Sequence, residues 1–256
     1  MRRLATVIRW TILSLCLAGS VRAETVEIAT GEFPPWTTEN ARHGGFVNRV
    51  VAAAFGRSGI KVKFTYMPWK RAETETKLGH YDGSAVWFAS QAGENDFVLS
   101  DPISHHKEVF FHLKSKPFPN WETLSDLRGI KIGATLGYTY TGEFWAMARD
   151  GELSVEVAAR DVLNLKKVAM GRLDAFPLDE MSGWLLLSDT TLFLPGVKEL
   201  FATAPRPLRA TAGYLRFPRH QPRTPYLVEK FNAGLLQMKN DGSYDRFLQE
   251  MISGVY

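Results

Sequence analysis

The chain has 256 residues and a single cysteine, Cys16. One thiol cannot form a disulfide within the chain, and it provides neither a redox pair nor a cysteine-based metal site. The sequence also lacks a hydrophobic run long enough to span a bilayer as a helix. Motifs typical of a nucleophile elbow, a phosphate-binding loop or a metal-dependent hydrolase are missing as well. These absences leave no recognisable catalytic motif in the chain.

The first 23 residues have the features of a secretory signal peptide. Three arginines among the first nine residues precede the short apolar run Trp10–Ala18, and the small residues needed for cleavage end at Ala23. A membrane anchor is the alternative, but the apolar run is too short to cross a bilayer. We expect cleavage after Ala23, a periplasmic location and a mature chain, beginning at Glu24, that does not insert into the membrane.

The charge of the expected mature chain is balanced. The whole sequence has 31 Lys and Arg against 27 Asp and Glu, but four arginines and no acidic residue lie in residues 1–23. Residues 24–256 therefore carry 27 charges of each sign. This balance argues against a nucleic-acid partner, which attracts strongly basic proteins. The remaining length suits one large domain or two small ones.

Strand and helix patterns alternate after the signal segment. Thr25–Thr30 alternates apolar and polar side chains as a half-buried strand does, and Pro34-Pro35 marks a loop. A helix is predicted over Phe46–Gly59 because apolar residues recur at helical spacing and a glycine ends the pattern. A strand at Val62–Tyr66 and a helix at Trp69–Leu78 follow. This order predicts a parallel sheet with right-handed crossovers.

A short pattern occurs twice and indicates two similar units. Gly79 and Gly171 each close a predicted helix, stand three residues before an aspartate and lead into an apolar segment. A glycine just past a helix adopts the left-handed conformation without penalty. Elsewhere, strands are predicted at 108–114, 130–136, 155–158 and 210–217, and helices at 141–149 and 162–170, with two more at the C-terminus. Residues 192–225 are rich in proline and are interpreted as a return connection.

Two α/β units and a late returning segment predict two chain crossings between two lobes, which permits hinge closure. We expect lobe 1 to contain residues 24–112 and 207–256 and lobe 2 to contain 113–206, each a mostly parallel sheet flanked by helices. In open parallel sheets, ligands bind beyond the C-terminal ends of the strands. These ends are the predicted loops at 31–36, 67–71, 86–91, 137–141 and 177–180.

Six segments in register resemble one protein family. They are Gly45-Phe46, Gly79-x-x-Asp82, Phe97–Pro102, Leu127–Gly133, Gly171–Asp179 and Asn240–Tyr244. Together they are similar to the extracellular solute-binding proteins of family 3, which serve ABC importers of polar amino acids. The resemblance implies a type II periplasmic binding protein that closes on a hinge. It also implies a small amino-acid-like or amine-bearing ligand, an inner-membrane ABC permease as partner, a monomer and no cofactor.

The chain departs from the family at one important position. Family members usually carry a Thr-x-x-Arg ahead of the Ser-Asp-Pro segment, and that arginine clamps the α-carboxylate of the ligand. Here Ser90 stands in place of the threonine and Gly93 in place of the arginine. Glycine cannot replace a planar fork of five donors. We therefore expect a site retuned away from an ordinary α-amino acid.

Two segments of the second unit are candidate ligand contacts. The resemblance implies that Asp179 holds a ligand ammonium, and the alternative is that it caps the helix from Met181 onward. In the family, the loop Gly137–Thr141 helps to hold a carboxylate, and free N–H groups at a helix start attract anions. We expect Tyr138 and Thr139 of this loop to contact the ligand, with simple helix capping as the alternative.

The first unit supplies the other candidates. Arg71 is a candidate replacement for the missing clamp, and Glu32 is a candidate partner for a cationic ligand, although both residues suit a solvated surface equally well. Aromatic residues in the rim loops suggest a flat or partly apolar ligand. For two of them, Trp36 and Tyr140, packing is the favoured interpretation. The aromatic residues expected to contact the ligand are Phe33, Trp69, Trp87, Phe88 and Tyr138.

The sequence also bears on metal binding, on a basic segment and on the overall function. His105, His106 and His112 do not have the spacing of a metal site, so no metal is expected. The arginines between residues 206 and 223 are interpreted as a solvated surface. Solute binding without catalysis is the favoured function. The alternatives are a small-molecule enzyme on the same fold, as in cyclohexadienyl dehydratases, and the sensing module of a receptor.

Overall fold

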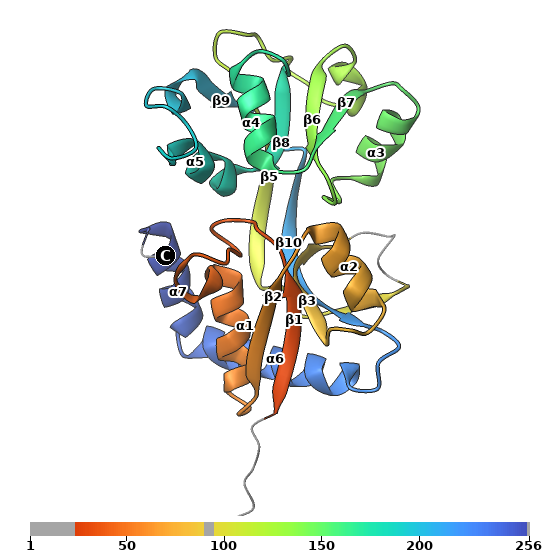
Figure 1. Ribbon diagram of the computed structural model, residues 1–256, viewed down its shortest axis with the longest axis vertical. Coiled ribbons are helices and arrows are strands. Elements are labelled where there is room, and N and C mark those ends of the chain that lie inside the picture. The colour runs from red at the N-terminus through yellow and green to blue at the C-terminus, as the bar shows by residue number, and fades with distance from the viewer. Residues whose placement is uncertain (1–23, 90–94, 255–256) are drawn as a thin grey trace, which may run out of the picture.

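The computed structural model describes residues 24–89 and 95–254. The chain forms two α/β lobes, drawn one above the other in Figure 1, and two long strands join them. The expected signal segment, residues 1–23, lies outside the described residues. The segment Ser90–Gly93, with its missing clamp arginine, lies outside them too.

Lobe 1 is built on three parallel strands. β1 (Thr25–Thr30) lies between β2 (Lys61–Tyr66) and β3 (Gly83–Phe88) and pairs with both in parallel. The helices of this lobe are α1 (Phe46–Gly56), α2 (Trp69–Lys77), α6 (Thr224–Asn240) and α7 (Ser243–Ile252). The predicted order of strand, helix, strand, helix and strand is therefore confirmed.

Lobe 2 repeats the same arrangement. β6 (Lys131–Thr135) lies between β7 (Ser154–Ala158) and β8 (Ala175–Asp179), again in parallel. Its helices are α3 (Gly142–Arg149), α4 (Asp161–Ala169) and α5 (Glu180–Ser188). In both lobes the C-terminal strand ends face the region between the lobes (Figure 1), so the loops that follow them meet there.

The two crossing strands are β5 (Ser104–Leu113) and β10 (Arg209–Pro218), which pair with each other in antiparallel register. β10 continues into lobe 1, where it pairs with β3 and β4 (Phe97–Leu99). β5 continues into lobe 2, where it pairs with β8 and β9 (Phe201–Thr203). One continuous sheet therefore runs through both lobes: the three strands of each unit pair in parallel, whereas β5 and β10 pair antiparallel with each other and with their neighbours in each lobe.

The structure corrects the sequence prediction at the crossing strands. β5 begins at Ser104 instead of Glu108, and the short strands β4 and β9 were not predicted. The start of β5 was missed because its inward positions are polar: Ser104 and His106 are buried, whereas His105 and Lys107 are exposed. The alternation of a strand is present, but it has the reverse of the usual hydrophobic pattern.

The two glycines of the repeated pattern have the predicted conformation. Gly79 has φ = 80° and Gly171 has φ = 69°, and each follows the last turn of a helix. Their amides donate to Thr76 O and Val168 O, which closes the helix ends. Each pattern then leads directly into an inner strand of its lobe.

Close packing of α1 against α6 stabilises lobe 1. The predicted apolar face of α1, which includes Val50, Val51 and Phe55, is fully buried. On α6, Gly234 approaches the backbone of Ala54 so closely that a Cβ added there would lie 2.0 Å from the Ala54 carbonyl oxygen. Only a residue without a side chain fits at this crossing.

We predict that Gly234→Ala destabilises the protein, although alanine favours a helix more than glycine. The methyl group meets backbone, so the helices must separate, at a cost of about 1–3 kcal/mol. Gly56→Ala is the matched control, because Gly56 is also helical and a Cβ there has no neighbour within 4 Å in the part of the chain that the structure describes. The control should be neutral or stabilised by up to about 1 kcal/mol. Urea unfolding of both variants measures the difference, and equal midpoints would contradict this packing.

Candidate functional site

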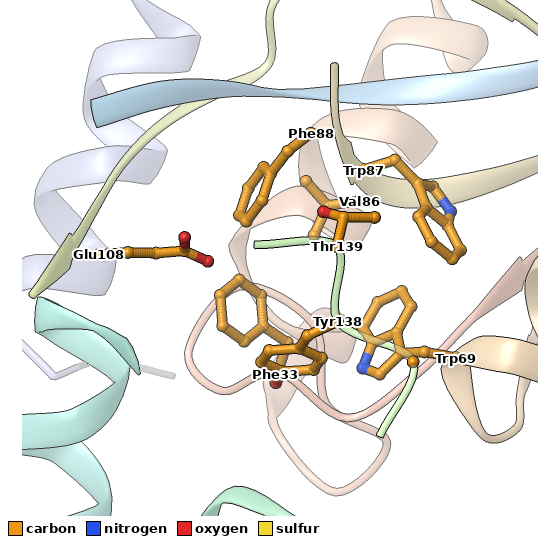
Figure 2. A pocket seen from close by; sticks show the side chains of 9 residues that line it. Phe33, Trp69, Val86, Trp87, Phe88, Glu108, Tyr138 and Thr139 are labelled. Carbon is orange, nitrogen blue, oxygen red and sulfur yellow. The ribbon is translucent and has the colours of Figure 1, made fainter. Parts of the chain in front are cut away.

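A cavity lies between the lobes, and all its walls are side chains or backbone near the ends of sheet strands (Figure 2). Its free space is about 360 Å³, part of which is open to solvent. Lobe 1 supplies the residues after β1, at the start of α2 and at the end of β3, lobe 2 supplies the loop after β6, and β5 supplies one residue. The lining residues are Phe33, Trp69, Val86, Trp87, Phe88, Glu108, Gly137, Tyr138 and Thr139.

Most of the predicted contacts lie on this cavity. Six of the nine predicted ligand-binding residues line it: Phe33, Trp69, Trp87, Phe88, Tyr138 and Thr139. Glu32, Arg71 and Asp179 do not. Glu108, Val86 and Gly137 line the cavity although they were not predicted as site residues. Contact of any of these residues with a ligand stays a prediction.

The aromatic rings of the cavity wall contact one another edge to face. Trp69 and Trp87 are 5.6 Å apart at 87°, and Phe33 lies 6.0 Å from Tyr138 at 81°. Phe88 completes this wall at 6.3 Å from Phe33. The edge-to-face geometry is the one aromatic pairs prefer, so the walls support one another.

The polar atoms of three of these rings are already hydrogen-bonded to the protein. Trp69 Nε1 donates to the Glu32 carbonyl at 3.2 Å, and Trp87 Nε1 donates to Ser84 Oγ at 2.8 Å. Tyr138 Oη donates to Asp161 Oδ2 at 2.7 Å. The rings therefore offer the cavity apolar surface and π electrons in place of hydrogen-bond donors.

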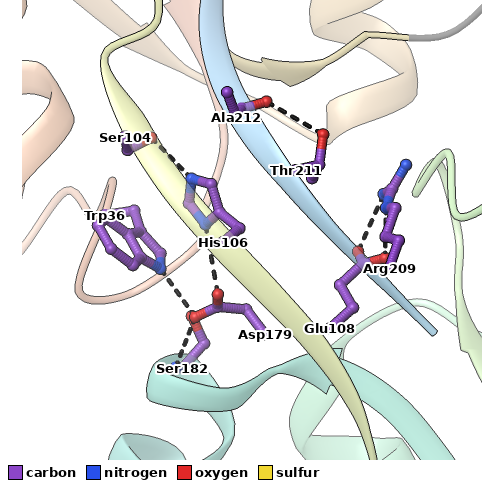
Figure 3. Close-up of polar contacts among 9 residues, drawn as sticks. All are labelled: Trp36, Ser104, His106, Glu108, Asp179, Ser182, Arg209, Thr211 and Ala212. Carbon is purple, nitrogen blue, oxygen red and sulfur yellow. Dashed lines mark hydrogen bonds and ion pairs between the residues drawn. The ribbon is translucent and has the colours of Figure 1, made fainter. Parts of the chain in front are cut away.

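Glu108 and Arg209 form an ion pair beside the cavity. The two residues are direct cross-strand partners on β5 and β10, and Arg209 binds both carboxylate oxygens at 2.6 and 3.0 Å (Figure 3). Glu108 points toward Phe33 and Phe88 in Figure 2, and the Arg209 guanidinium lies 4.6 Å from the Phe88 ring centre. Burial raises the pKa of Glu108, and the charge of Arg209 opposes that rise.

The interpretation of the arginine run as a solvated surface was wrong for two of its members. The side chain of Arg209 is 14% exposed and is tied to Glu108. Arg216 is buried, lies 4.4 Å from the Trp87 ring centre and pairs with Glu73 at 3.4 Å. Both residues lie on β10: Arg209 is covered where the lobes meet, and Arg216 is covered by Glu73, Trp87 and Phe97 of lobe 1.

A buried carboxyl group on lobe 2 holds one wall of the cavity. Asp161, at the start of α4, accepts hydrogen bonds from Thr135 Oγ1 at 2.6 Å and from the Tyr138 hydroxyl. Burial raises the pKa of Asp161 to about 6, despite these hydrogen bonds, and the negative charges of Glu108 and Asp179 add to the rise. An acidic residue at the start of a helix is common, so no sequence pattern indicated this role.

Asp179 lies at the end of β8 and is almost fully buried. It caps α5 by accepting from the Ser182 amide and hydroxyl, both at 3.0 Å, which confirms the capping interpretation. It also accepts from Trp36 Nε1 at 2.9 Å and lies 3.3 Å from His106 Nδ1 (Figure 3). Burial alone would raise the pKa of Asp179, but the bonds from His106, Trp36 and Ser182 outweigh it and hold that pKa below its ordinary value.

These contacts join the two lobes in a closed arrangement. Trp36 belongs to lobe 1 and Asp179 to lobe 2, so their hydrogen bond spans the opening between the lobes. His106 lies between them on β5 and packs against Trp36 with ring centres 4.4 Å apart. Nearby, a Cβ added to Gly137 of lobe 2 would lie 3.1 Å from Lys70 N of lobe 1. Packing of Trp36, the favoured interpretation, is confirmed by its burial.

The remaining candidates lie away from the cavity wall. The Arg71 side chain is 67% exposed and lies 3.7 Å from Glu75 on the next turn of α2. The Glu32 side chain is exposed and accepts from the Glu39 amide. Tyr140 is buried and its hydroxyl accepts from the Thr135 amide, which confirms the packing interpretation.

Within residues 24–89 and 95–254, no three His, Cys, Asp or Glu side chains come together in a way that could hold a metal ion. Over the same part of the chain, no helix has the length and apolar character needed to cross a membrane.

The two lobes, the paired crossing strands and the cavity between them define a type II periplasmic-binding-protein fold, as expected. The model of the family "Bacterial extracellular solute-binding proteins, family 3" matches residues 26–253. The chain belongs to this family, and the resemblance seen in the sequence is confirmed.

Several solved structures share the fold. An ancestral arginine-binding protein bound to arginine is 22% identical, with a TM-score of 0.74 over 89% of this chain and 97% of that one. A histidine kinase sensor domain with similarity to periplasmic binding proteins is 17% identical, with a TM-score of 0.76 over 90% and 96%. An amino acid ABC transporter substrate-binding protein from Streptococcus pneumoniae, bound to L-arginine, is 15% identical, with a TM-score of 0.72 over 90% and 94%. At these identities the likeness concerns the fold alone, and no curated protein matches the chain.

We predict that the Asp161 carboxyl makes stability depend on pH. Its folded-state pKa of about 6 lies above the value of 3.8 for an unperturbed aspartate, so its contribution to stability is present at low pH and is lost as the pH rises through 6. Relative to Asp161→Asn, the wild type should lose up to about 3 kcal/mol between pH 4 and pH 8. Urea unfolding of both proteins at several pH values measures this difference, in which the other titrating groups cancel. A difference that does not vary with pH would contradict the raised pKa.

Proposed function

We propose that this protein captures a small solute between its lobes in the periplasm and delivers it to an inner-membrane ABC permease. One observation carries the proposal: the walls of the cavity come from both lobes and from a crossing strand, as Trp69, Tyr138 and Glu108 illustrate. A solute in this cavity touches both lobes only when they are closed, so binding and closure are coupled. Membership of the solute-binding family supports the transport role and the periplasmic location.

The proposal includes the processing expected from the sequence. Residues 1–23 would direct export and be removed after Ala23, and the mature protein would act as a monomer. The permease would recognise the closed and loaded form. Family membership supports the export step, since the family consists of extracellular solute-binding proteins.

We propose that the six predicted ligand-binding residues on the cavity wall contact the solute directly. An ammonium group on Asp179 would have to displace Trp36 or His106, because both oxygens of this carboxylate are already engaged. Arg71 would have to leave Glu75 and swing across the opening. The aromatic walls favour a solute with an apolar or flat face over one recognised by hydrogen bonds alone.

An enzymatic role has one structural feature in its favour. Ser104 Oγ lies 2.7 Å from His106 Nε2, and His106 Nδ1 lies 3.3 Å from Asp179, which is the order of groups in a serine-hydrolase triad. However, Ser104 is 1% exposed and belongs to the interior of the crossing strands. A substrate carbonyl cannot approach its hydroxyl in the closed form, so we propose binding without catalysis. A sensory role would also require solute binding, and the family favours transport.

The proposed function is tested by thermal unfolding of the purified protein against a panel of small solutes. A solute that binds only the folded protein raises the melting temperature as its concentration rises. We expect at least one solute to do so and to be recovered unchanged by NMR after incubation. If a stabilising solute is chemically converted, the protein is an enzyme. If no solute of the panel raises the melting temperature, the result contradicts solute capture.

We predict that Trp36→Phe weakens closure. The variant keeps an aromatic ring but removes the indole N–H that Asp179 accepts across the lobes. Losing a hydrogen bond to a charged acceptor costs about 1.5–3 kcal/mol. The apparent affinity for any stabilising solute should therefore fall by about 10-fold or more, because less of the protein is closed. Small-angle scattering of the solute-free variant should show a larger radius of gyration.

Trp121→Phe is the matched control for this experiment. Trp121 is a buried tryptophan in the core of lobe 2, and its Nε1 has no hydrogen-bond partner among residues 24–89 and 95–254. The control should keep the affinity and the radius of gyration of the wild type. Equal changes in the two variants would show that the Trp36 contact does not hold the lobes together.

A further inference from the structure

The charged side chains buried around the cavity are not balanced. Glu108 lines the cavity, and Asp161 accepts a hydrogen bond from the Tyr138 hydroxyl. Asp179 contacts His106, whose ring stacks on Phe33 of the cavity wall. Among the described residues, Arg209 pairs with Glu108 and His106 lies 3.3 Å from Asp179, whereas the partners of Asp161 are the uncharged hydroxyls of Thr135 and Tyr138. Arg216 lies behind Trp87 and is matched by Glu73. The surroundings of the cavity therefore favour a positive charge inside it.

The three carboxylates interact with one another across the sheet. Glu108 and Asp179 are direct partners in the register of β5 and β8. After burial, which is the largest cause, the charge of Asp179 contributes to the raised pKa of Glu108, and both charges contribute to the raised pKa of Asp161. A cation in the cavity would relieve this repulsion.

The walls of the cavity suit a cation of a particular kind. The indole N–H groups of Trp69 and Trp87 and the hydroxyl of Tyr138 are directed to protein acceptors, so their hydrogen-bonding capacity is used. The face of an aromatic ring attracts a cation through its quadrupole and needs no hydrogen bond from it. Trp87 and Phe88 already lie against Arg216 and Arg209. One face of Phe33 stacks on His106, so the rings available to a ligand are Trp69, Tyr138 and the other face of Phe33.

A primary ammonium group is a poor match for these walls. It carries three N–H donors, and each needs an acceptor when it is buried. Each oxygen of Glu108 already accepts one hydrogen bond from Arg209, and Asp179 is engaged by Trp36, His106 and Ser182 away from the cavity wall, so the described wall offers fewer open acceptor sites on carboxylates than the three donors need. A trimethylated ammonium has no N–H group, so the shortage of acceptors costs it nothing.

We propose that the cavity binds a small organic cation bearing a quaternary ammonium group, held by Trp69, Phe33 and Tyr138 and attracted by the buried carboxylates. This inference rests on the proposed function, since it concerns the ligand of the same site. Thr139, whose hydroxyl also lies on the cavity, can bond a hydroxyl or carboxylate elsewhere on such a ligand.

Calorimetric titration with three compounds of matched skeleton tests the inference. They are choline, its uncharged carbon analogue 3,3-dimethylbutan-1-ol, and ethanolamine, which has a primary ammonium. We expect choline to bind at least about 10-fold more tightly than either analogue, because it combines the charge with the methyl groups. Equal binding of the uncharged analogue, or tighter binding of ethanolamine, would overturn the inference.

Variants of Trp69 give the matched control. Trp69→Leu removes the π face and should weaken choline binding by about 10-fold or more, whereas Trp69→Phe keeps a face and should recover most of the affinity. Equal affinities in the two variants would overturn the assignment.

A bound cation should also lower the pKa of Asp161, so choline binding near pH 6 should release protons. Calorimetric titration in buffers of different ionisation enthalpy detects this release.

The failure of this inference is distinguishable from failure of the proposed function. If choline and tetramethylammonium both fail to bind but another solute of the thermal panel binds and loses affinity in Trp69→Leu, the quaternary ammonium is overturned and solute capture stands. If no solute binds, both are overturned.

Discussion

The site depends on the antiparallel pairing of β5 with β10. This pairing carries the chain between the lobes twice, and it places Arg209 directly opposite Glu108. The partner of Glu108 on its other side is Asp179, at the end of β8. A cation, a buried acid beside the cavity and a second acid thus lie in a row across the sheet at the junction of the lobes. Because the register fixes this row, the local charge is a property of the fold.

The closed arrangement explains why so few polar groups remain for a ligand. Trp36 approaches from lobe 1 and His106 from the crossing strand, and both bind Asp179. Together with the cap of α5, these contacts engage both oxygens of the carboxylate. In family members that bind amino acids, an acid at the matching position is expected to hold an ammonium, but here the protein itself supplies the donors. The proposed ligand would therefore be recognised through aromatic surface and the field of buried charges more than through hydrogen bonds.

The sequence predicted the aromatic wall because it follows from topology. The C-terminal ends of parallel strands meet at one edge of each sheet, so Phe33, Trp87 and Tyr138 had to face the space between the lobes once the strands were identified. The side chains of the crossing strands could not be placed in the same way. β5 turns Ser104, His106 and Glu108 inward, a polar alternation that resembles an exposed strand. Its inward face becomes clear only when both lobes pack around it.

Long polar side chains were the other source of error. Arg71 is on an exposed face of α2, whereas Arg209 is held by a carboxylate that lies 101 positions earlier in the chain. Sequence spacing contains no information on such a contact. Asp161 was missed for the same reason, because its partner Tyr138 comes from a different loop. The aromatic residues of a site are predictable from strand ends, but the charges that tune the site depend on tertiary pairing.

Native mass spectrometry of the freshly purified, exported protein tests the central claim most directly. If the two lobes capture a solute against Trp69, the wild type should retain one small molecule per chain, and Trp69→Leu should lose it under the same conditions. A wild type that carries no small molecule even when solutes are supplied in excess would contradict capture between the lobes. Equal retention by the wild type and by Trp69→Leu would place the solute elsewhere on the protein.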